Sequence, residues 1–425
     1  MKKIIVAAII ILFICPCAYS KDLHIDIQAK GFTRLNVAMP PFAGRSGSAL
    51  DLWKICSKDL EMSGVFTLLA PKGYLSPGPI AHVKEGTLKD WMLIGADYVI
   101  TGMVTDKDKR VELGIEVIKV ATSRVILKKT YAIAAKNRVR LAHSFMDDFM
   151  DKSLGLSPVF SSRIVCCQKK QGKKQLFMSW CDGTAGKTIS GLGNLVLNPA
   201  WAPGAGHIAF VSYWRDNPDL YMLDLASFRV RLVSSSPGIN TTPAFTPSGD
   251  KIAATLFKYG NPDIFLVDIK TRKATRLTKS WGTDTSPSFS PDAKTMVFCS
   301  SRGGNPQIYI RDIATRRIQR LTFEGKYNTA PAFSPRGDLI AFTHSAKDKR
   351  FHIAVIRPDG SHMRVLPGTL NGDESPSFSP DGRLIAFASS DGNIYVCDLA
   401  GSDPVRVIGG QGVYTEPSWS GVVER

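Results

Sequence analysis

The sequence predicts a mainly β protein, a six-bladed β-propeller preceded by a small α/β domain. Two observations carry this prediction. A short phrase built on Pro-x-aromatic occurs six times at nearly even spacing, and strand-like segments fill each interval. Residues before about 158 lack the phrase and alternate between strand-like and helix-like segments. Repeats of about forty residues with several short strands are typical of propellers, in which each repeat forms one sheet.

The first twenty residues have the features of a cleaved signal peptide. Lys2 and Lys3 precede the apolar run 4–14, which is too short to span a bilayer. Small residues at 18 and 20 suit a signal peptidase, so we expect cleavage near Ser20 and export to the periplasm. A lipoprotein attached through Cys15 is the competing interpretation, but Ile14 stands where a small residue is wanted. No later run reaches the length of a membrane-spanning helix.

Residues 21–157 predict the small α/β domain, which joins the propeller at Ser157-Pro158. The expected elements are, in chain order, strand 35–39, a helix capped by Ser48 and ended by Gly64 with the apolar face Leu50, Trp53, Cys56 and Leu60, strands 65–69, 98–104, 111–120 and 125–133, and helix 139–154 ended by Gly155. Ahead of them, Lys21 to Ile27 alternates apolar and charged residues, as an edge strand or a detachable partner-binding strand would.

The repeated phrase predicts the innermost strand of each blade. Proline has no amide donor and is tolerated on a strand with a free edge, which the strand facing the central channel has. The aromatic residue two positions later is then a wedge between neighbouring blades. The six phrases begin at Pro199, Pro243, Pro287, Pro331, Pro376 and Pro417 and carry Trp201, Phe245, Phe289, Phe333, Phe378 and Trp419.

Three further strands follow each of the first five phrases. A type I turn such as Ser379-Pro-Asp-Gly382 leads into an apolar second strand such as 384–389. A third strand ends in an aspartate, which we expect to cap the strand end. These aspartates are Asp224, Asp268, Asp312 and Asp398.

The sixth phrase ends the chain, and its missing strands lie before the first phrase, at 163–167, 175–180 and 188–190. We therefore expect the propeller to occupy 158–425 and its last strand to complete the blade begun near residue 160. Such closure removes the open sheet edges that invite aggregation.

Composition narrows the class of protein. The formal net charge is +17, which suits anionic surroundings. The basic residues are scattered without a stacking-aromatic pattern, so nucleic acid is not an expected partner. Cys166 or Cys167 could meet Cys181 in one disulfide, and the other cysteines that follow the leader are expected to be buried free thiols. None has metal-ligand spacing.

The sequence predicts no catalytic residue, cofactor or metal. Gly183 to Thr188 resembles the end of a phosphate-binding loop, but its position between short strands predicts a hairpin turn. No Gly-x-Ser-x-Gly phrase occurs. The seven histidines form no close ligand pair, so ordinary core or surface roles are expected for His24, His82, His143, His207, His344, His352 and His362.

The whole mature chain resembles the TolB family of periplasmic Tol-Pal proteins. Beyond the blades, the resemblance lies in Leu60-Glu-Met-Ser-Gly-Val-Phe66, in residues 91–102 and in the junction 155–164. It implies a monomeric, non-enzymatic hub that links the outer membrane to the inner membrane, maintains envelope integrity and supports outer-membrane constriction at division.

The resemblance implies two partners, with other outer-membrane proteins as further candidates. A TolA-like inner-membrane protein would bind the segment Asp22, Leu23, His24, Ile25, Asp26 and Ile27. A Pal-like, peptidoglycan-associated lipoprotein would bind one mouth of the channel, where polar residues that differ between blades begin the innermost strands. These residues are Asn240, Thr241, Thr242, Asp284, Thr285, Ser286, Asn328, Thr329, Ala330, Asp373, Glu374, Ser375, Thr415 and Glu416.

Two other functions stay open at the level of sequence. A propeller can bind a small ligand or an oligosaccharide in its channel. It can also hold a hydrolase site, for which glycoside cleavage needs paired carboxylates. Asp373, Glu374 and Glu416 are the candidates near one mouth.

Overall fold

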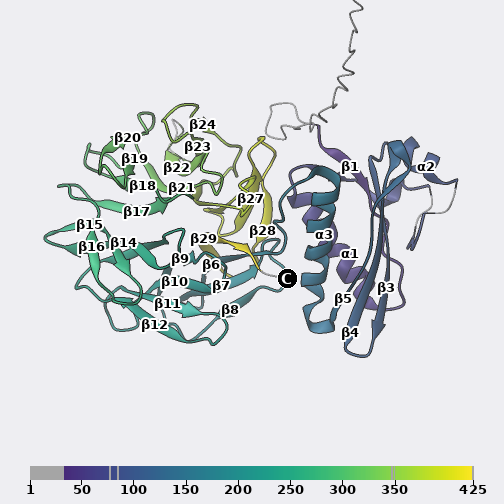
Figure 1. Cartoon of the computed structure of the whole chain (residues 1–425), viewed down its shortest axis with the longest axis horizontal. Coiled ribbons are helices and arrows are strands. Elements are labelled where there is room, and N and C mark those ends of the chain that lie inside the picture. Colours follow the sequence, from purple (N-terminus) through teal and green to yellow (C-terminus); the bar gives the residue numbers. More distant parts are fainter. Residues whose placement is uncertain (1–32, 76–77, 84–85, 346–347, 349, 424–425) are drawn as a thin grey trace, which may run out of the picture.

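The computed structural model describes residues 33–423 except 76–77, 84–85, 346–347 and 349. It consists of an amino-terminal α/β domain and a six-bladed β-propeller, which lie side by side (Figure 1). The predicted fold class is confirmed. The proposed signal peptide and the segment Asp22 to Ile27 lie outside the described residues.

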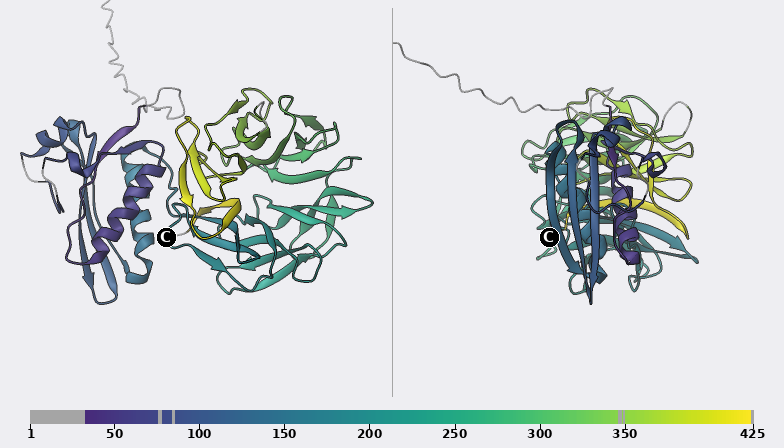
Figure 2. Two further views of the ribbon diagram at one scale, coloured as in Figure 1. Left: turned by 180° about the vertical axis from the view of Figure 1, so that it is seen from behind. Right: turned by 90° about the vertical axis from the view of Figure 1, so that its right-hand side faces the viewer.

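The amino-terminal domain is a five-stranded sheet with two long helices on one face. The sheet order is β2-β1-β3-β4-β5. Helices α1 and α3 lie between this sheet and the propeller (Figures 1 and 2). The elements are β1 (Leu35–Ala38), α1 (Gly47–Met62), β2 (Phe66–Leu68), α2 (Leu88–Leu93), β3 (Tyr98–Lys107), β4 (Arg110–Lys119), β5 (Arg124–Ala134) and α3 (Arg138–Leu154), with 3-10 turns at Pro71–Gly73, Val120–Thr122 and Ala135–Asn137.

The first helix differs in detail from its prediction. Ser46, not Ser48, occupies the N-cap position, and no side-chain cap hydrogen bond forms. Leu50 is 49% exposed, whereas Leu52 and Ile55 are buried with Cys56 and Leu60. The buried stripe is therefore shifted around the helix, because α1 packs against both α3 and the sheet.

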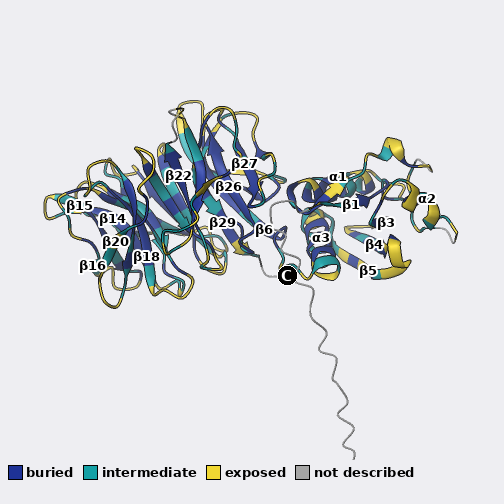
Figure 3. Ribbon diagram, turned by 90° about the horizontal axis from the view of Figure 1, so that it is seen from above, coloured by how far each residue is buried: buried dark blue, intermediate teal, exposed yellow. Residues whose placement is uncertain are grey.

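Each blade is a four-stranded antiparallel sheet. Written from the innermost strand outwards, blade 1 is β9 (Val196–Trp201), β10 (His207–Ser212), β11 (Asp219–Asp224) and β12 (Val230–Ser234); blade 2 is β13 (Asn240–Phe245), β14 (Lys251–Lys258), β15 (Asn261–Asp268) and β16 (Ala274–Arg276); blade 3 is β17 (Asp284–Phe289), β18 (Thr295–Ser300), β19 (Gln307–Asp312) and β20 (Ile318–Arg320); blade 4 is β21 (Asn328–Phe333), β22 (Ile340–Ser345), β23 (Phe351–Ile356) and β24 (Arg364–Val365); and blade 5 is β25 (Asp373–Phe378), β26 (Leu384–Ser389), β27 (Ile394–Asp398) and β28 (Val405–Ile408). The strands are largely buried and the exposed residues gather in the loops (Figure 3).

Blade 6 closes the ring as predicted. Its order is β29 (Val413–Val422), β6 (Ser162–Lys170), β7 (Lys173–Trp180) and β8 (Lys187–Ile189). Trp419 lies opposite Ile164 in the antiparallel register, and its indole Nε1 donates to the Ser162 hydroxyl at 2.7 Å. The carboxy-terminal strand β29 is thus the innermost strand of blade 6, whose other three strands come first in the propeller sequence.

The repeated proline lies in a β-bulge on the innermost strand. At each proline the register shifts by one residue, as between Thr241 and Ala244. The residue before each proline has a left-handed backbone conformation with φ between 48° and 57°, although none is glycine. Such a conformation costs about 1–3 kcal/mol. Six strained bulges therefore surround the channel, one in each blade.

Serine in the repeated phrase joins neighbouring blades. The hydroxyl of Ser418 accepts a hydrogen bond from the backbone N–H of Trp201 at 3.2 Å, across the boundary between blades 6 and 1. Ser377 does the same for the N–H of Trp419 at 2.9 Å. The aromatic residues pack between blades as predicted, since Trp201 lies in one buried cluster with Val165 of blade 6.

The predicted strand-end role of the aspartates is confirmed. The carboxylate of Asp268 accepts from the N–H groups of Lys270 and Thr271, and Asp398 does so from Gly401 and Ser402. The segment that resembles a phosphate-binding loop is the β7–β8 hairpin, as expected.

The disulfide that the sequence left open, between Cys181 and either Cys166 or Cys167, does not form. The six described cysteines are all buried and free, and the Cys181 thiol donates instead to the carbonyl oxygen of Phe160 at 3.4 Å. No helix in the described part of the chain is long and apolar enough to cross a membrane.

The domains meet at turns of blades 5 and 6. Arg383, which is 4% exposed, bonds Asp381 in its own turn and donates to the carbonyl of Ser63 in the amino-terminal domain at 3.2 Å. Arg34 pairs with Asp398 at 3.3 Å. These turns join the first to the second strand and the third to the fourth strand, so they lie on the propeller face opposite the starts of the innermost strands.

Candidate functional site

The innermost strands all begin on one face of the propeller, which we call the mouth face. In a four-stranded meander, the loops between blades and the turns from the second to the third strand lie at the same end. Backbone hydrogen bonds confirm this, from Phe257 N to Ile239 O and from Ser345 N to Tyr327 O, both at 2.8 Å. The amino-terminal domain contacts turns of the other face, which leaves the mouth face uncovered among the described residues.

Four of the residues predicted to contact a partner are buried. Asn240, Asp284, Asn328 and Asp373 each have 0% exposure and bond the loop that precedes their strand. Asp373 accepts from the N–H of Thr369 at 2.8 Å, for example, and burial raises the pKa of Asp373. The structure places these four side chains beneath the mouth face, where they fix the loops.

The remaining predicted residues form the rim of the channel. Thr241, Thr242, Thr285, Ser286, Thr329, Ala330, Ser375, Thr415 and Glu416 are partly buried, and Glu374 is exposed. Hydrogen bonds join them around the rim. Thr241 donates to Asn198 of blade 1 at 2.7 Å, and Thr242 accepts from the N–H of Ser286 at 3.1 Å. These bonds link rim residues of blades 1, 2 and 3.

Two of the three rim carboxylates are held by other groups. Glu416 accepts from the N–H of Asn198 at 2.6 Å and pairs with Lys174 at 2.8 Å, while Asp373 is turned into its loop. Within the described ranges, none of the three belongs to a group of metal-ligand side chains.

An exposed apolar collar surrounds the rim. Large apolar side chains at least 38% exposed lie in the inter-blade loops and in the turns from second to third strands of the mouth face. They are Leu195, Tyr213, Trp214, Ile239, Phe257, Tyr259, Trp281, Phe323, Tyr327, Leu370 and Val413. On the described opposite face, Phe228 is the comparable residue. Large exposed apolar side chains gathered on one face are typical of protein interaction sites.

The sequence did not lead us to predict this collar, because the prediction was based on the repeated strands. The collar residues lie between the repeated strands and differ from blade to blade. The available signal was large apolar residues in segments otherwise rich in glycine, serine and asparagine, such as Trp281 at 78% exposure and Tyr259 at 80%.

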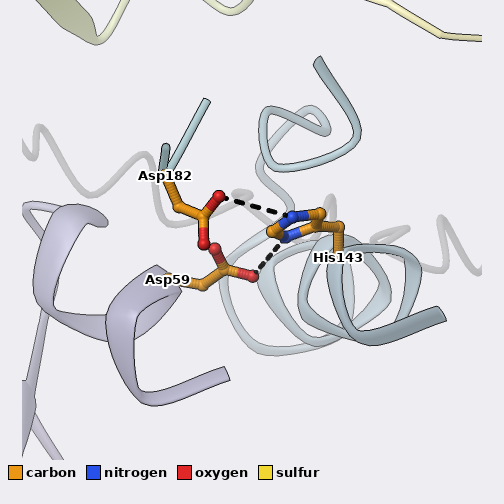
Figure 4. Close-up of side chains that lie close together, drawn as sticks. All are labelled: Asp59, His143 and Asp182. Carbon is orange, nitrogen blue, oxygen red and sulfur yellow. Dashed lines mark hydrogen bonds and ion pairs between the residues drawn. The ribbon is translucent and has the colours of Figure 1, made fainter. Parts of the chain in front are cut away.

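A second cluster of polar side chains lies at the domain junction (Figure 4). Asp59 of α1, His143 of α3 and Asp182, which follows β7, each have 0% exposure. His143 Nδ1 lies 2.8 Å from Asp59 Oδ2, and its Nε2 lies 3.6 Å from Asp182 Oδ1. Among the described residues, these three are the group whose ligand atoms are close enough to hold a metal ion.

The geometry favours an ion-pair network over a metal site. The 2.8 Å separation is that of a direct charge-assisted hydrogen bond. Burial lowers the pKa of His143, but the carboxylates of Asp59 and Asp182 outweigh burial and raise it to about 9. A cationic His143 therefore joins two helices of one domain to a turn of the other. Sequence spacing gave no sign of it, because His143 and Asp59 are 84 positions apart.

Comparison with known proteins matches this architecture to one family. The family model "TolB beta propeller domain" matches residues 151–423, and "TolB amino-terminal domain" matches residues 23–126. The Tol-Pal system protein TolB of Polaromonas naphthalenivorans is 31% identical over 224 residues, which are 52% of this chain and 51% of that protein. Its counterpart in Legionella pneumophila (strain Philadelphia 1) is 31% identical over 212 residues, 48% of each chain.

The chain spans about half the length of these curated relatives in the matched regions. Structural similarity extends further. The crystal structure of TolB from Acinetobacter baumannii superimposes with a TM-score of 0.82 at 29% identity, covering 92% of this chain and 97% of that one. The propeller model alone matches more than half of the sequence, and the amino-terminal model matches the domain that precedes it. The chain belongs to the TolB family.

Proposed function

We propose that the protein is a non-catalytic, periplasmic hub of a Tol-Pal system. It holds a Pal-like lipoprotein at the mouth face and a TolA-like inner-membrane protein at its amino-terminal segment. Holding both would connect the two membranes, maintain envelope integrity and couple outer-membrane constriction to division. The relatives named Tol-Pal system protein TolB support membership of the system.

The observation that carries the proposal is the apolar collar around a polar rim. Protein interfaces commonly have an apolar and aromatic centre with satisfied polar groups, and a few aromatic residues supply most of the binding energy. A collar spread over several blades suits a protein partner better than a small ligand, which would be enclosed by a deep pocket.

Binding to a TolA-like partner is assigned to Asp22 to Ile27. The alternation of apolar and charged residues in this segment suits addition of a strand to the sheet of another protein. Removal of residues 21–27 should abolish binding to a TolA-like protein and leave binding to a Pal-like protein unchanged. Equal loss of both would contradict separate sites.

The test of the mouth face is binding of a purified, unlipidated Pal-like protein to single variants. Trp281→Ala should weaken binding by roughly thirtyfold, because truncation of an aromatic hot spot costs about 2 kcal/mol or more. Thr285→Arg should weaken it by placing a bulky charge on the rim. Phe228→Ala, which removes a 57% exposed aromatic side chain from the opposite face, is the matched control.

Equal affinity of all three variants and the unmodified protein would refute the proposed interface. A different result would indicate a hydrolase in the channel. The protein would then cleave a glycan, and Glu374→Gln would abolish this cleavage.

A further inference from the structure

A small cavity at the domain junction has an unusual charge. Its volume is about 250 Å³, and its wall comes from both domains. Lys136 lies in the 3-10 turn before α3 and Arg140 in the first turn of α3, whereas Arg163 and Lys187 lie in β6 and β8 of blade 6. None of the described residues lining it is acidic. Four cationic residues thus line one partly open cavity, with Lys136 and Lys187 exposed and Arg140 and Arg163 partly buried.

The two arginines repel each other at this site. Burial lowers the pKa of Arg163, and the nearby guanidinium of Arg140 lowers it further. Like charges brought together in a partly buried space destabilise one another, more strongly than on an open surface. A bound anion would offset this repulsion. Because guanidinium groups have several N–H donors in a planar fork, they match the oxygens of phosphate well.

The surrounding residues help to orient an anion. The guanidinium of Arg163 lies over the Trp180 ring, 4.9 Å from its centroid, so packing restricts the position of the charge. The first turn of α3 also lines the cavity, and the amino-terminal end of this 17-residue helix carries partial positive charge. These contributions reinforce the four cationic side chains, and the cavity is distant in the fold from the mouth face.

We propose that this cavity binds a phosphate group and that the bound anion ties the amino-terminal domain to blade 6. The volume is below the roughly 300–1,000 Å³ typical of pockets for larger organic ligands, so the occupant is small. It is either free phosphate or the headgroup of an anionic phospholipid. The proposal does not rest on the proposed hub function.

The first experiment is calorimetric titration of the mature chain with inorganic phosphate at constant ionic strength. Saturable binding near one site per chain is expected. Arg163→Gln and Lys187→Gln should each weaken it by about tenfold, the effect of losing one charge-assisted hydrogen bond. Lys173→Gln, which removes an exposed charge from the β6–β7 hairpin of the same blade, should leave the affinity unchanged.

The second experiment distinguishes the sources of phosphate. Co-sedimentation with phosphatidylglycerol vesicles, compared with phosphatidylcholine vesicles, tests the headgroup. If the protein binds these vesicles, and Lys187→Gln reduces this binding while Lys173→Gln does not, the occupant is a lipid headgroup. If binding is seen only by calorimetry, the occupant is free phosphate.

Two results would overturn the proposal. One is the absence of saturable binding to both millimolar phosphate and phosphatidylglycerol vesicles. The other is equal affinity in the unmodified chain, Lys187→Gln and Lys173→Gln. Melting curves without phosphate check that each variant folds, and the exposed position of Lys187 makes its variant decisive if Arg163→Gln is unstable.

Discussion

The buried ion-pair network at the domain junction makes a quantitative prediction for Asp59→Asn. The substitution keeps the size of the side chain and removes the charge that lies 2.8 Å from His143. Both side chains have 0% exposure, so water cannot replace the lost partner. Removing one member of a buried pair costs roughly 3–5 kcal/mol. Because Asp182 remains 3.6 Å from the other ring nitrogen, we expect a loss near the lower end.

The assay is urea unfolding followed by tryptophan fluorescence. Trp180 is a suitable reporter, since its ring lies 5.1 Å from the ring of His143. Asp51→Asn is the matched control, because Asp51 and Arg138 also join α1 to α3 but are 48% and 44% exposed. Exposed pairs contribute about 0–1 kcal/mol. Equal effects of Asp59→Asn and Asp51→Asn would refute the reasoning.

The same network predicts a loss of stability at alkaline pH. The pKa of His143 is raised from 6.5 to about 9, so its proton favours the folded state. This contribution is complete below pH 6.5 and is lost as the pH rises through about 9. Its upper limit is about 3 kcal/mol. Burial raises the pKa of Asp59 as well, so protonation of Asp59 also favours the folded state. This contribution to stability is likewise lost as the pH rises, but at lower pH than the contribution of His143.

Comparison of the unmodified protein with His143→Gln tests this dependence. Unfolding free energies measured from pH 6 to pH 10 should fall for the unmodified protein and stay flatter for the variant. Identical slopes would show that another group is responsible.

Two further predictions concern ring closure. Deleting residues 413–425 should open the propeller, lower its melting temperature and expose blade 6 to proteolysis, and an unchanged melting curve would contradict this. Gly183→Ala should prevent stable folding, because its Cβ would lie 1.9 Å from the carbonyl oxygen of Val407 in blade 5. Gly155→Ala is the control, because Gly155 has a similar left-handed backbone but no heavy atom within 4 Å of the position that a Cβ would occupy. It should reduce the free energy of unfolding by only about 1–2 kcal/mol. Equal yields of soluble protein from the two variants would count against the predicted clash.

The propeller could be predicted because its determinants are local and repeated. Each Pro-x-aromatic phrase and its turn specify one blade through neighbouring residues, four blades add a strand-end aspartate, and the incomplete sixth phrase indicates where the ring closes. The left-handed residue before each proline was not predictable, because residues such as Thr242 and Glu416 have no intrinsic preference for that conformation. Tertiary structure imposes it.

The sites were less predictable than the fold. Position in the repeat located the channel rim, but it could not separate the buried Asn240 from the partly buried Thr241 beside it, because Asn240 is held by hydrogen bonds to the loop that precedes its strand. The junction network and the cationic cavity combine residues from distant parts of the chain. Helix packing brings them together, and no periodicity in the sequence records that packing.

Strand β29 has a consequence for how the chain reaches its folded state. The bond between Trp419 and Ser162 joins positions 257 residues apart, so the first propeller sheet to be synthesised is the last to be finished. Until the final residues emerge from the ribosome, β6 has an unpaired edge that can pair wrongly with other chains. A prematurely terminated product would carry this edge permanently, and its tendency to aggregate would increase with concentration.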